Sequence, residues 1–576
     1  LACRARARPA PPGVRSGDAV LATSGGRTLI EVGGLVARSL GGSGAWLHAI
    51  EWRAADPPAP GASCWRIVGE GELADSLRRC VPAGPAEGAL VVGTGSLEAN
   101  VRAVLEALGR NERVRIVTAG AQLESSEPLQ AALWGLGRTI ALERRELFGG
   151  LIDLDPGAPD PARALDRADG EDQVAYRGGV RRLARLVRAS NVLTAEAIRI
   201  RSDAAYLVTG GLGALGLAVA RWLVGRGARR LVLAGRRPPA DPVPVESLRA
   251  AGVEVAVVSA DVSGSGDLVG AGPLAGIIHA AGVLDDGVLA SQSWERFERV
   301  LAPKARAAER LVRLARERGV DFLALFSSSA GVLGSPGQAN YAAANAAMDA
   351  VARRARAEGV PAISIVWGPW AGDGMAAASG EAGRRRRAAL GMDDLPPAQA
   401  LETFGRLLGA GIAEIAVLPA RWEAVGAAWP GGSPRLLERL VPSAAPVAEV
   451  ARELERLAPA ELEDRLLSLV RAEVRRALDW PAAKPLGDAE RLFELGLDSL
   501  LAIDLRERLQ IVVGRPLPAT LLFERPTVGA LAAHLAGEFA APVAAEESDL
   551  GGLLEELEEM SEEEAARMLS RLEGGA

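Results

Sequence analysis

Strand-like apolar runs and helix-like patterns alternate along most of the chain. In residues 41–203 the apolar runs lie at 47–52, 65–68, 90–92, 114–118 and 151–154, with helical patterns between them. In residues 204–430 a first run at 206–208 is followed by a glycine-rich turn and an amphipathic helix pattern, LAVARWLVGRG. This alternation predicts two consecutive α/β units.

The segments outside these units have other patterns. Residues 1–40 alternate weakly and predict two or three strands without a core of their own, as at the end of a preceding domain. Residues 431–457 are rich in Pro, Ala and Ser and predict a linker. Residues 458–541 predict an all-helical unit with helices at 460–478, 500–510 and 528–540, and residues 542–576 predict an acidic helical tail.

Composition narrows the class of protein. A chain of 576 residues has room for three or four domains, and Leu1 in place of a starting Met suggests a piece of a longer polypeptide. The 49% apolar and 24% charged residues, without an apolar run of membrane-spanning length, predict a soluble cytoplasmic protein, and the net charge of −7 argues against broad nucleic-acid binding. The few cysteines and histidines have no metal-ligand spacing, so we expect no metal and no disulfide framework. These residues are Cys3, Cys64, Cys80, His48, His279 and His534.

A glycine-rich turn opens the second α/β unit. It reads Thr209, Gly210, Gly211, Leu212, Gly213, Ala214, Leu215, Gly216. Such glycines let the backbone approach a pyrophosphate, and the N-terminus of the following helix attracts its charge. Twenty residues later, Arg236 and Arg237 stand where NAD enzymes place an acid on the ribose. We therefore expect a 2′-phosphate and NADPH rather than NADH.

The first unit carries a partial version of the same fingerprint. Gly69, Gly71 and Ala74 follow a strand, but Glu70 and Glu72 would put carboxylates where a pyrophosphate has to lie. The first unit is therefore predicted to be structural.

Polar side chains gather in the run FSSSAGVLGSPGQANYAAAN at 326–345. Ser328 ends a strand, and Tyr341 and Asn345 are four residues apart on one helix face. A tyrosine beside a hydroxyl at the carboxyl edge of a sheet can protonate a carbonyl oxygen. A buried tyrosine satisfied by a serine would show the same pattern, but here a cofactor-type glycine loop accompanies it.

Taken together, TGGLGALG, AGRR, Asp261-Val262, HAAGVLDD, the 326–345 run and WGPWAGDGM resemble the ketoreductase domain of modular type I polyketide synthases, in the short-chain dehydrogenase/reductase superfamily. The resemblance covers residues 45–430 and implies two Rossmann-like subdomains. The first, with LWGLGRTIALE, is similar to the family's structural subdomain and is degenerate; the second binds NADPH. Besides the glycine loop and the two arginines, the implied cofactor-binding residues are Asp261, Val262, Ala280, Ala281 and Gly282.

The resemblance also implies catalytic roles. Tyr341 donates the proton, Ser328 hydrogen-bonds the carbonyl, Lys304 lowers the tyrosine pKa, and Asn345 orders the proton path. Most short-chain reductases have a lysine at the position of Asn345; in these ketoreductases the two residues trade places. His279 is expected to be a satisfied strand residue.

The helical unit resembles acyl carrier proteins. In LFELGLDSLLAIDLRERL, Asp498 and Ser499 could be a simple helix N-cap, but the surroundings match the signature in which the serine carries 4′-phosphopantetheine. The predicted fold class is therefore α/β with two Rossmann-like subdomains, followed by a small all-α four-helix carrier domain.

Several residues bear on the stereochemistry implied by the resemblance. Leu284-Asp285-Asp286 marks B-type reductases, and Leu333 stands where A-type enzymes have a tryptophan, so we expect the D-configured 3-hydroxyacyl product. Trp367 and Met375 complete the expected substrate side. Pro336 occurs in epimerising relatives, but a Gly-Ser-Pro-Gly turn explains it without epimerisation.

The expected partners are a carrier-bound β-ketoacyl substrate, a phosphopantetheinyl transferase, upstream domains ending in a dehydratase tail, and a downstream module, within a homodimeric megasynthase. Residues 546–576 contain eleven acidic and two basic residues and an apolar stripe, which fits either a solvated tail or a docking helix. Two alternatives are a free-standing reductase of soluble ketones and a non-catalytic carrier or docking module.

Overall fold

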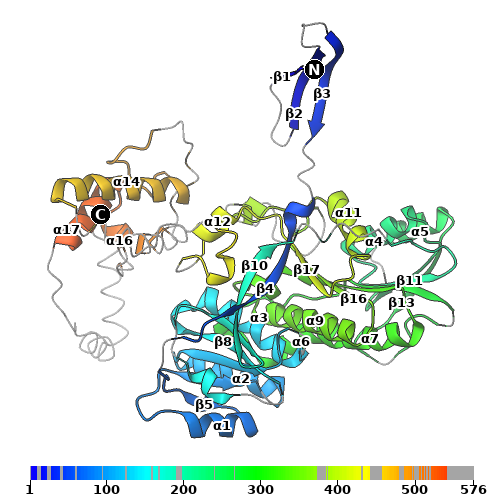
Figure 1. Ribbon diagram of the computed structural model, residues 1–576, viewed down its shortest axis with the longest axis horizontal. Coiled ribbons are helices and arrows are strands. Elements are labelled where there is room, and N and C mark those ends of the chain that lie inside the picture. Colours follow the sequence, from blue (N-terminus) through cyan, green and yellow to red (C-terminus); the bar gives the residue numbers. More distant parts are fainter. Residues whose placement is uncertain are drawn as a thin grey trace, which may run out of the picture. The chain divides into compact units, whose positions relative to one another are not determined.

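The computed structural model describes the backbone of three strands within residues 2–38, residues 43–441 with short gaps, the longest at 373–383, and segments between residues 454 and 540 (Figure 1). Two compact units result, Leu1–Ala444 and Ala445–Ala576. Ser499, Met375 and the tail at 542–576 lie outside the described residues.

The N-terminal residues form a three-stranded antiparallel sheet. Its strands are β1 (Ala2–Arg8), β2 (Val14–Ala22) and β3 (Thr28–Arg38), in that order. The prediction of two or three strands is confirmed, and their origin in a dehydratase stays a prediction.

Residues 204–430, which contain the glycine-rich turn, are called the cofactor-type half below. They contribute seven parallel strands to a larger sheet, in the order β13-β12-β11-β14-β15-β16-β17. The strands are β11 (Ala205–Thr209), β12 (Arg230–Gly235), β13 (Glu254–Ser259), β14 (Leu274–His279), β15 (Phe322–Ser328), β16 (Ala362–Trp367) and β17 (Glu414–Val417). The chain runs outward from β11 to β13 and then returns to β14 on the other side of β11. Such a reversal opens a crevice at the carboxyl ends of the strands, where ligands bind in α/β sheets.

The N-terminal half continues the same sheet in the order β4-β10-β9-β8-β7-β6-β5. The strands are β4 (Leu47–Ala55), β5 (Arg66–Val68), β6 (Ala89–Val92), β7 (Val114–Ala119), β8 (Phe148–Leu154), β9 (Gln173–Arg177) and β10 (Val180–Arg188). From β5 to β9 the strands follow one another in chain order, without the reversal that opens a crevice. The structural role of this half stays a prediction.

The two halves share one fourteen-stranded sheet rather than two separate sheets. Strand β4 pairs antiparallel with β17, with Ala416 opposite His48 and Val417 opposite Leu47, and pairs on its other side with β10. Across this seam, the Trp422 indole donates a hydrogen bond to His48 Nε2 (3.0 Å). The sequence predicted two subdomains because it contains no local signal for pairing between strands so far apart in the chain.

Helices cover both faces of the sheet. In the N-terminal half they are α1 (Glu72–Cys80), α2 (Leu97–Gly109) and α3 (Pro128–Glu143); in the cofactor-type half they are α4 (Ala214–Gly225), α5 (Val243–Ala250), α6 (Trp294–Leu301), α7 (Ala307–Arg318), α8 (Ser329–Leu333), α9 (Ala339–Ala357), α11 (Pro397–Leu407) and α12 (Trp422–Ala427). One core lies under α4, α5 and α11, and another under α7 and α9. Helices α3 and α9 cross closely enough that a Cβ on Gly135 would clash with the Ala342 carbonyl (Figure 1).

The second unit is helical in its described part. Helices α14 (Pro459–Ala477), α16 (Leu521–Glu524) and α17 (Val528–Ala540) share an apolar core that includes Leu466, Val470 and Leu531. The predicted helix at 500–510 is described only in part. No helix in the described part of the chain has both the length and the apolar character that a membrane crossing requires.

Candidate active site

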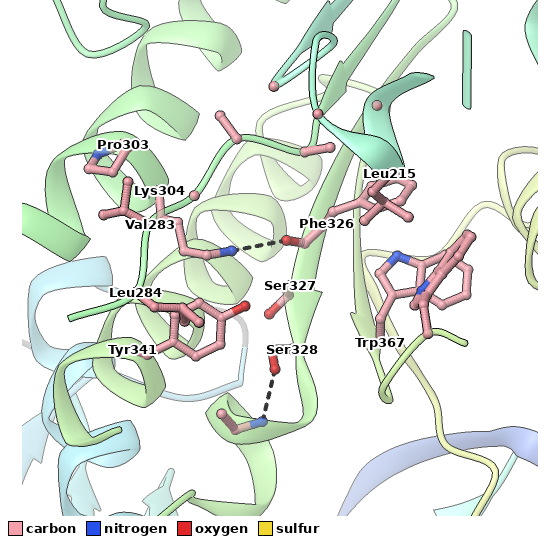
Figure 2. Close-up of a pocket in the computed structure, with 18 of the residues that line it drawn as sticks. Leu215, Val283, Leu284, Pro303, Lys304, Phe326, Ser327, Ser328, Tyr341 and Trp367 are labelled. Carbon is pink, nitrogen blue, oxygen red and sulfur yellow. Dashed lines mark hydrogen bonds between the residues drawn. The ribbon is translucent and has the colours of Figure 1, made fainter. Parts of the chain in front are cut away.

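A cavity of about 1040 Å³ opens at the carboxyl ends of β11, β12, β14, β15 and β16 (Figure 2). Most of the site residues predicted from the sequence line this cavity. These are Gly210, Leu212, Gly213, Gly216, Arg236, Arg237, Asp261, Val262, Ala280, Ala281, Gly282, Leu284, Asp286, Lys304, Ser328, Tyr341 and Trp367. The volume is that of a site for a large organic ligand.

One end of the cavity is shaped by the glycine turn. Gly210 adopts φ +69, a conformation that favours glycine, and a Cβ on Gly216 would clash with the Gly210 carbonyl oxygen. Helix α4 begins directly after Gly213, so the N–H groups of its first turn lie at the cavity wall. This cradle fits the pyrophosphate of a dinucleotide.

Charged side chains stand on the rim beyond the glycine turn. Arg236 and Arg237 follow β12 and are exposed. Asp261 Oδ1 accepts hydrogen bonds from the Ser263 N–H (2.9 Å) and hydroxyl (2.6 Å), and these bonds hold the pKa of the Asp261 carboxyl below its usual value. Two exposed guanidinium groups at this point suit a phosphate on the adenosine ribose.

Three different elements meet at the reactive end of the cavity. Ser328 ends β15, Tyr341 lies in the first turn of α9, and Lys304 lies in a π-helical turn, η6 (Ala302–Arg306), between α6 and α7. The Tyr341 hydroxyl points toward Ser327 and Ser328 at the end of β15, and the Lys304 side chain extends toward Phe326 of the same strand (Figure 2). The Lys304 ammonium donates to the Phe326 carbonyl (3.2 Å) and lies 5.1 Å from the centre of the Tyr341 ring.

Burial shifts the pKa values of Lys304 and Tyr341 in opposite directions. It lowers the pKa of Lys304 to about 8, against an opposing effect of Asp349, and it raises the pKa of Tyr341, against smaller effects of Ser328 and Asn345. The net effect on Tyr341 is a raised pKa, because loss of hydration outweighs the hydrogen bonds from Ser328 and Asn345. That Lys304 lowers the pKa of this phenol stays a prediction. A raised pKa keeps the phenol protonated at neutral pH, which is the form a proton donor needs.

Asn345 lies one turn after Tyr341 in α9 and does not line the cavity. Its amide nitrogen donates to the Tyr341 carbonyl (2.7 Å), and its Oδ1 is buried without a partner. A buried acceptor of this kind is usually satisfied by an ordered water. One turn further along α9, the buried Asp349 accepts a hydrogen bond from Ser364 (2.5 Å), and burial raises its pKa. The sequence analysis missed Asp349, although the spacing 341, 345, 349 marks one helix face.

Other predicted residues lie outside the cavity. The Thr209 side chain is fully buried and bonded to His279 (2.6 Å), so it does not face the cavity; Gly211 packs under the turn. Asp285 is paired with Arg296 (2.8 Å) and Arg299 (2.7 Å), and Leu333 is buried in a core beside β16. His279, whose Nε2 lies 3.2 Å from the Lys304 carbonyl, is a satisfied buried residue as expected, and burial lowers its pKa to about 3.

Three family models match the chain. Residues 204–372 match the KR domain, residues 468–535 the phosphopantetheine attachment site, and residues 50–186 the Rossmann fold domain of the polyketide synthase extender module SpnB.

Curated relatives cover most of the chain. Polyketide synthase GfsA of Streptomyces halstedii is 40% identical over 73% of the chain, and the pikromycin polyketide synthase component PikAIII of Streptomyces venezuelae is 36% identical over 74%. The chain spans only 6% and 29% of the lengths of these relatives.

Solved structures agree with the family models. The first ketoreductase of the tylosin polyketide synthase is 33% identical, with a TM-score of 0.59, over 69% of this chain and 98% of that one. A structure described as A-type ketoreductases from a modular polyketide synthase is 28% identical, with a TM-score of 0.63, over 69% and 98% of the two chains.

Proposed function

The chain belongs to the ketoreductases of modular polyketide synthases, and we propose from this that it uses NADPH to reduce a β-ketoacyl thioester, bound to phosphopantetheine on Ser499, to a 3-hydroxyacyl thioester. The observation that carries the proposal is the convergence of Tyr341, Ser328 and Lys304 at the end of a cavity that begins with the glycine turn.

The proposed chemistry assigns one role to each side chain. Tyr341, whose phenol is protonated at neutral pH, donates its proton to the ketone oxygen while Ser328 donates a hydrogen bond to the same oxygen. Lys304, whose pKa of about 8 leaves it mostly charged at neutral pH, stabilises the phenolate that remains. A water held by Asn345 Oδ1 is the proposed route by which the proton is restored.

The cofactor's part follows from the fit of the cavity. NADPH, when bound, supplies the hydride. The turn at Gly210 to Gly216 and the N-terminus of α4 would hold its pyrophosphate, and Arg236 and Arg237 its 2′-phosphate. Ala280, Ala281 and Gly282, which follow β14, leave the middle of the cavity open; a Cβ on Gly282 would press on Lys304.

The Tyr341→Phe substitution tests the assignment of the proton donor. We expect turnover to fall by roughly 100-fold or more, because general acid catalysis contributes about that much. The NADPH dissociation constant should stay within about twofold, since the hydroxyl is removed and the ring is kept. NADPH oxidation with a β-ketoacyl thioester and fluorescence titration measure the two quantities. Full turnover in the variant would refute the role.

We also propose the B-type product, with the D-configured hydroxyl. The support is that Leu284 and Asp286 line the cavity, while Leu333, at the position of the A-type tryptophan, is buried in the core. Chiral chromatography of the reduced thioester tests this proposal. Predominantly L-configured product would overturn it.

A further inference from the structure

Glu143 is the last residue of α3 in the N-terminal half, and its half-buried carboxylate contacts two loops of the other half. Its Oε2 accepts a hydrogen bond from the Leu289 N–H (2.9 Å), and its Oε1 accepts one from the Gly337 N–H (2.7 Å). Both oxygens of the Glu143 carboxylate thus accept hydrogen bonds from backbone N–H groups that are far apart in the chain. Hydrogen bonds to a charged acceptor are among the stronger ones in proteins.

These loops, 283–289 and 334–338, form part of the cavity wall, and we call them the substrate-side loops. The first contributes Leu284 and Asp286, and the second contributes Ser335 and Gln338 directly before the Tyr341 helix. Two further bonds join the loops. The Gly287 N–H donates to the Gly337 carbonyl (2.7 Å), and the Gln338 amide donates to the Asp286 carboxylate (3.0 Å).

Two other residues of α3 form hydrogen bonds with the segment 331–335, in and next to the second loop. Arg138, which is buried, donates to the Gly331 carbonyl (2.6 Å), and the Thr139 hydroxyl accepts from the Ser335 N–H (3.3 Å). Gly334 and Gly337, both within the loop 334–338, have φ +77, a backbone conformation that favours glycine. A loop of this composition needs external contacts to keep one shape.

We propose that Glu143 is a positioning residue, which holds the substrate-side loops at a fixed separation and thereby fixes how the acyl chain is presented to Tyr341. The inference rests on the proposed reductase function. In this proposal the N-terminal half helps to orient the substrate through the Glu143 carboxylate, although Glu143 does not line the cavity.

Glu143→Gln and Glu143→Ala, made in the full chain, test the proposal. The amide can still accept one bond but cannot accept from both donors, whereas alanine accepts none. The matched control is Glu146→Gln, three residues away, where an exposed carboxylate pairs with Arg144 (2.7 Å). The measurements are kcat, KM for a β-ketoacyl thioester, the ratio of hydroxyl enantiomers, the NADPH dissociation constant, and amide hydrogen exchange in the two loops.

We expect the KM to rise roughly tenfold in Glu143→Ala and less in Glu143→Gln, because charge-assisted hydrogen bonds are lost. The excess of one hydroxyl enantiomer over the other should also decrease. Exchange in both loops should accelerate, while NADPH binding and the Glu146→Gln control should not change. An unchanged KM and enantiomer ratio, or a loss of NADPH binding in step with KM, would overturn the inference. An inactive wild-type chain would instead contradict the proposed function, and the exchange measurement would still report on the loops.

Discussion

Lys304 shows how a single backbone irregularity places a functional side chain. Pro303 has no N–H to continue the α-helical pattern, and the chain passes through a π turn in which the Ala307 N–H donates to the Ala302 carbonyl, five residues back. The turn directs Lys304 inward, where it is 2% exposed. A lysine in an ordinary helix would be expected on the surface. The cost of this burial appears as the lowered pKa.

A residue-scale prediction concerns Arg236. Arg236→Ala should raise the KM for NADPH roughly tenfold or more, because the proposed charged hydrogen bond to the 2′-phosphate would be lost, and should change the KM for NADH less than about twofold. Steady-state kinetics with both cofactors measure the difference. Arg230→Ala is the control, since Arg230 pairs with Glu254 at the other end of β12. Equal losses for both cofactors would contradict the contact.

Much of the site was predictable at this scale, because glycine spacing and the positions of Ser328 and Tyr341 depend on local geometry. The orientation of side chains was not. Thr209 ends β11 and Asp285 lies in the loop after β14, both near the crevice, yet the Thr209 side chain bonds to His279 and the Asp285 side chain pairs with two arginines. The contacts of Glu143 depend on packing between elements distant in the chain, for which the sequence holds no local signal, whereas Asp349 could have been found from its helix spacing.

At the scale of elements, β9 and β10 are the strands of the N-terminal half that the sequence pattern did not predict. Strand β10 is rich in arginine, and apolar alternation alone does not identify it. Its charges are satisfied by tertiary ion pairs, Arg185 with Glu171 (2.7 Å) and Arg181 with Asp169 (2.7 Å). Strand β4, in contrast, was predicted, but its role as the join between the halves could not be.

The seam between β4 and β17 should be sensitive to acid. Burial lowers the pKa of His48 to about 4, below its usual value near 6.5, so the unfolded chain takes up a proton that the folded chain does not. This contribution to stability is present above pH 6.5 and is lost as the pH falls toward 4. At pH 5 the loss amounts to roughly 2 kcal/mol.

Urea unfolding at pH 7.5 and pH 5, followed by tryptophan fluorescence, checks this prediction, since all but one of the eleven tryptophans lie in the Leu1–Ala444 unit. His48→Gln keeps a hydrogen-bond acceptor for Trp422 but does not titrate, so it should lose less stability between the two pH values than the wild type. Identical losses would show that His48 does not set the acid sensitivity.

At the scale of the whole molecule, the reductase and the phosphopantetheine attachment domain are separate compact units. We therefore expect Ser499→Ala to abolish the added mass of phosphopantetheine after treatment with a transferase, while reduction of a free thioester continues. Mass spectrometry and NADPH oxidation measure the two effects. The control is Ser468→Ala on an exposed position of α14, which should still gain the mass. Modification of the Ser499→Ala protein would disprove the assignment.

The continuous sheet also decides where such a reductase can be cut for transfer into another synthase. A graft that begins near residue 204 would leave the outer edge of β17 without β4, so that backbone groups paired in the native protein would be open to pairing with other chains. It would also remove α3 from the back of the Tyr341 helix. A transferable piece has to begin before β4, at or ahead of residue 43, and a shorter graft should aggregate even though every catalytic residue is present.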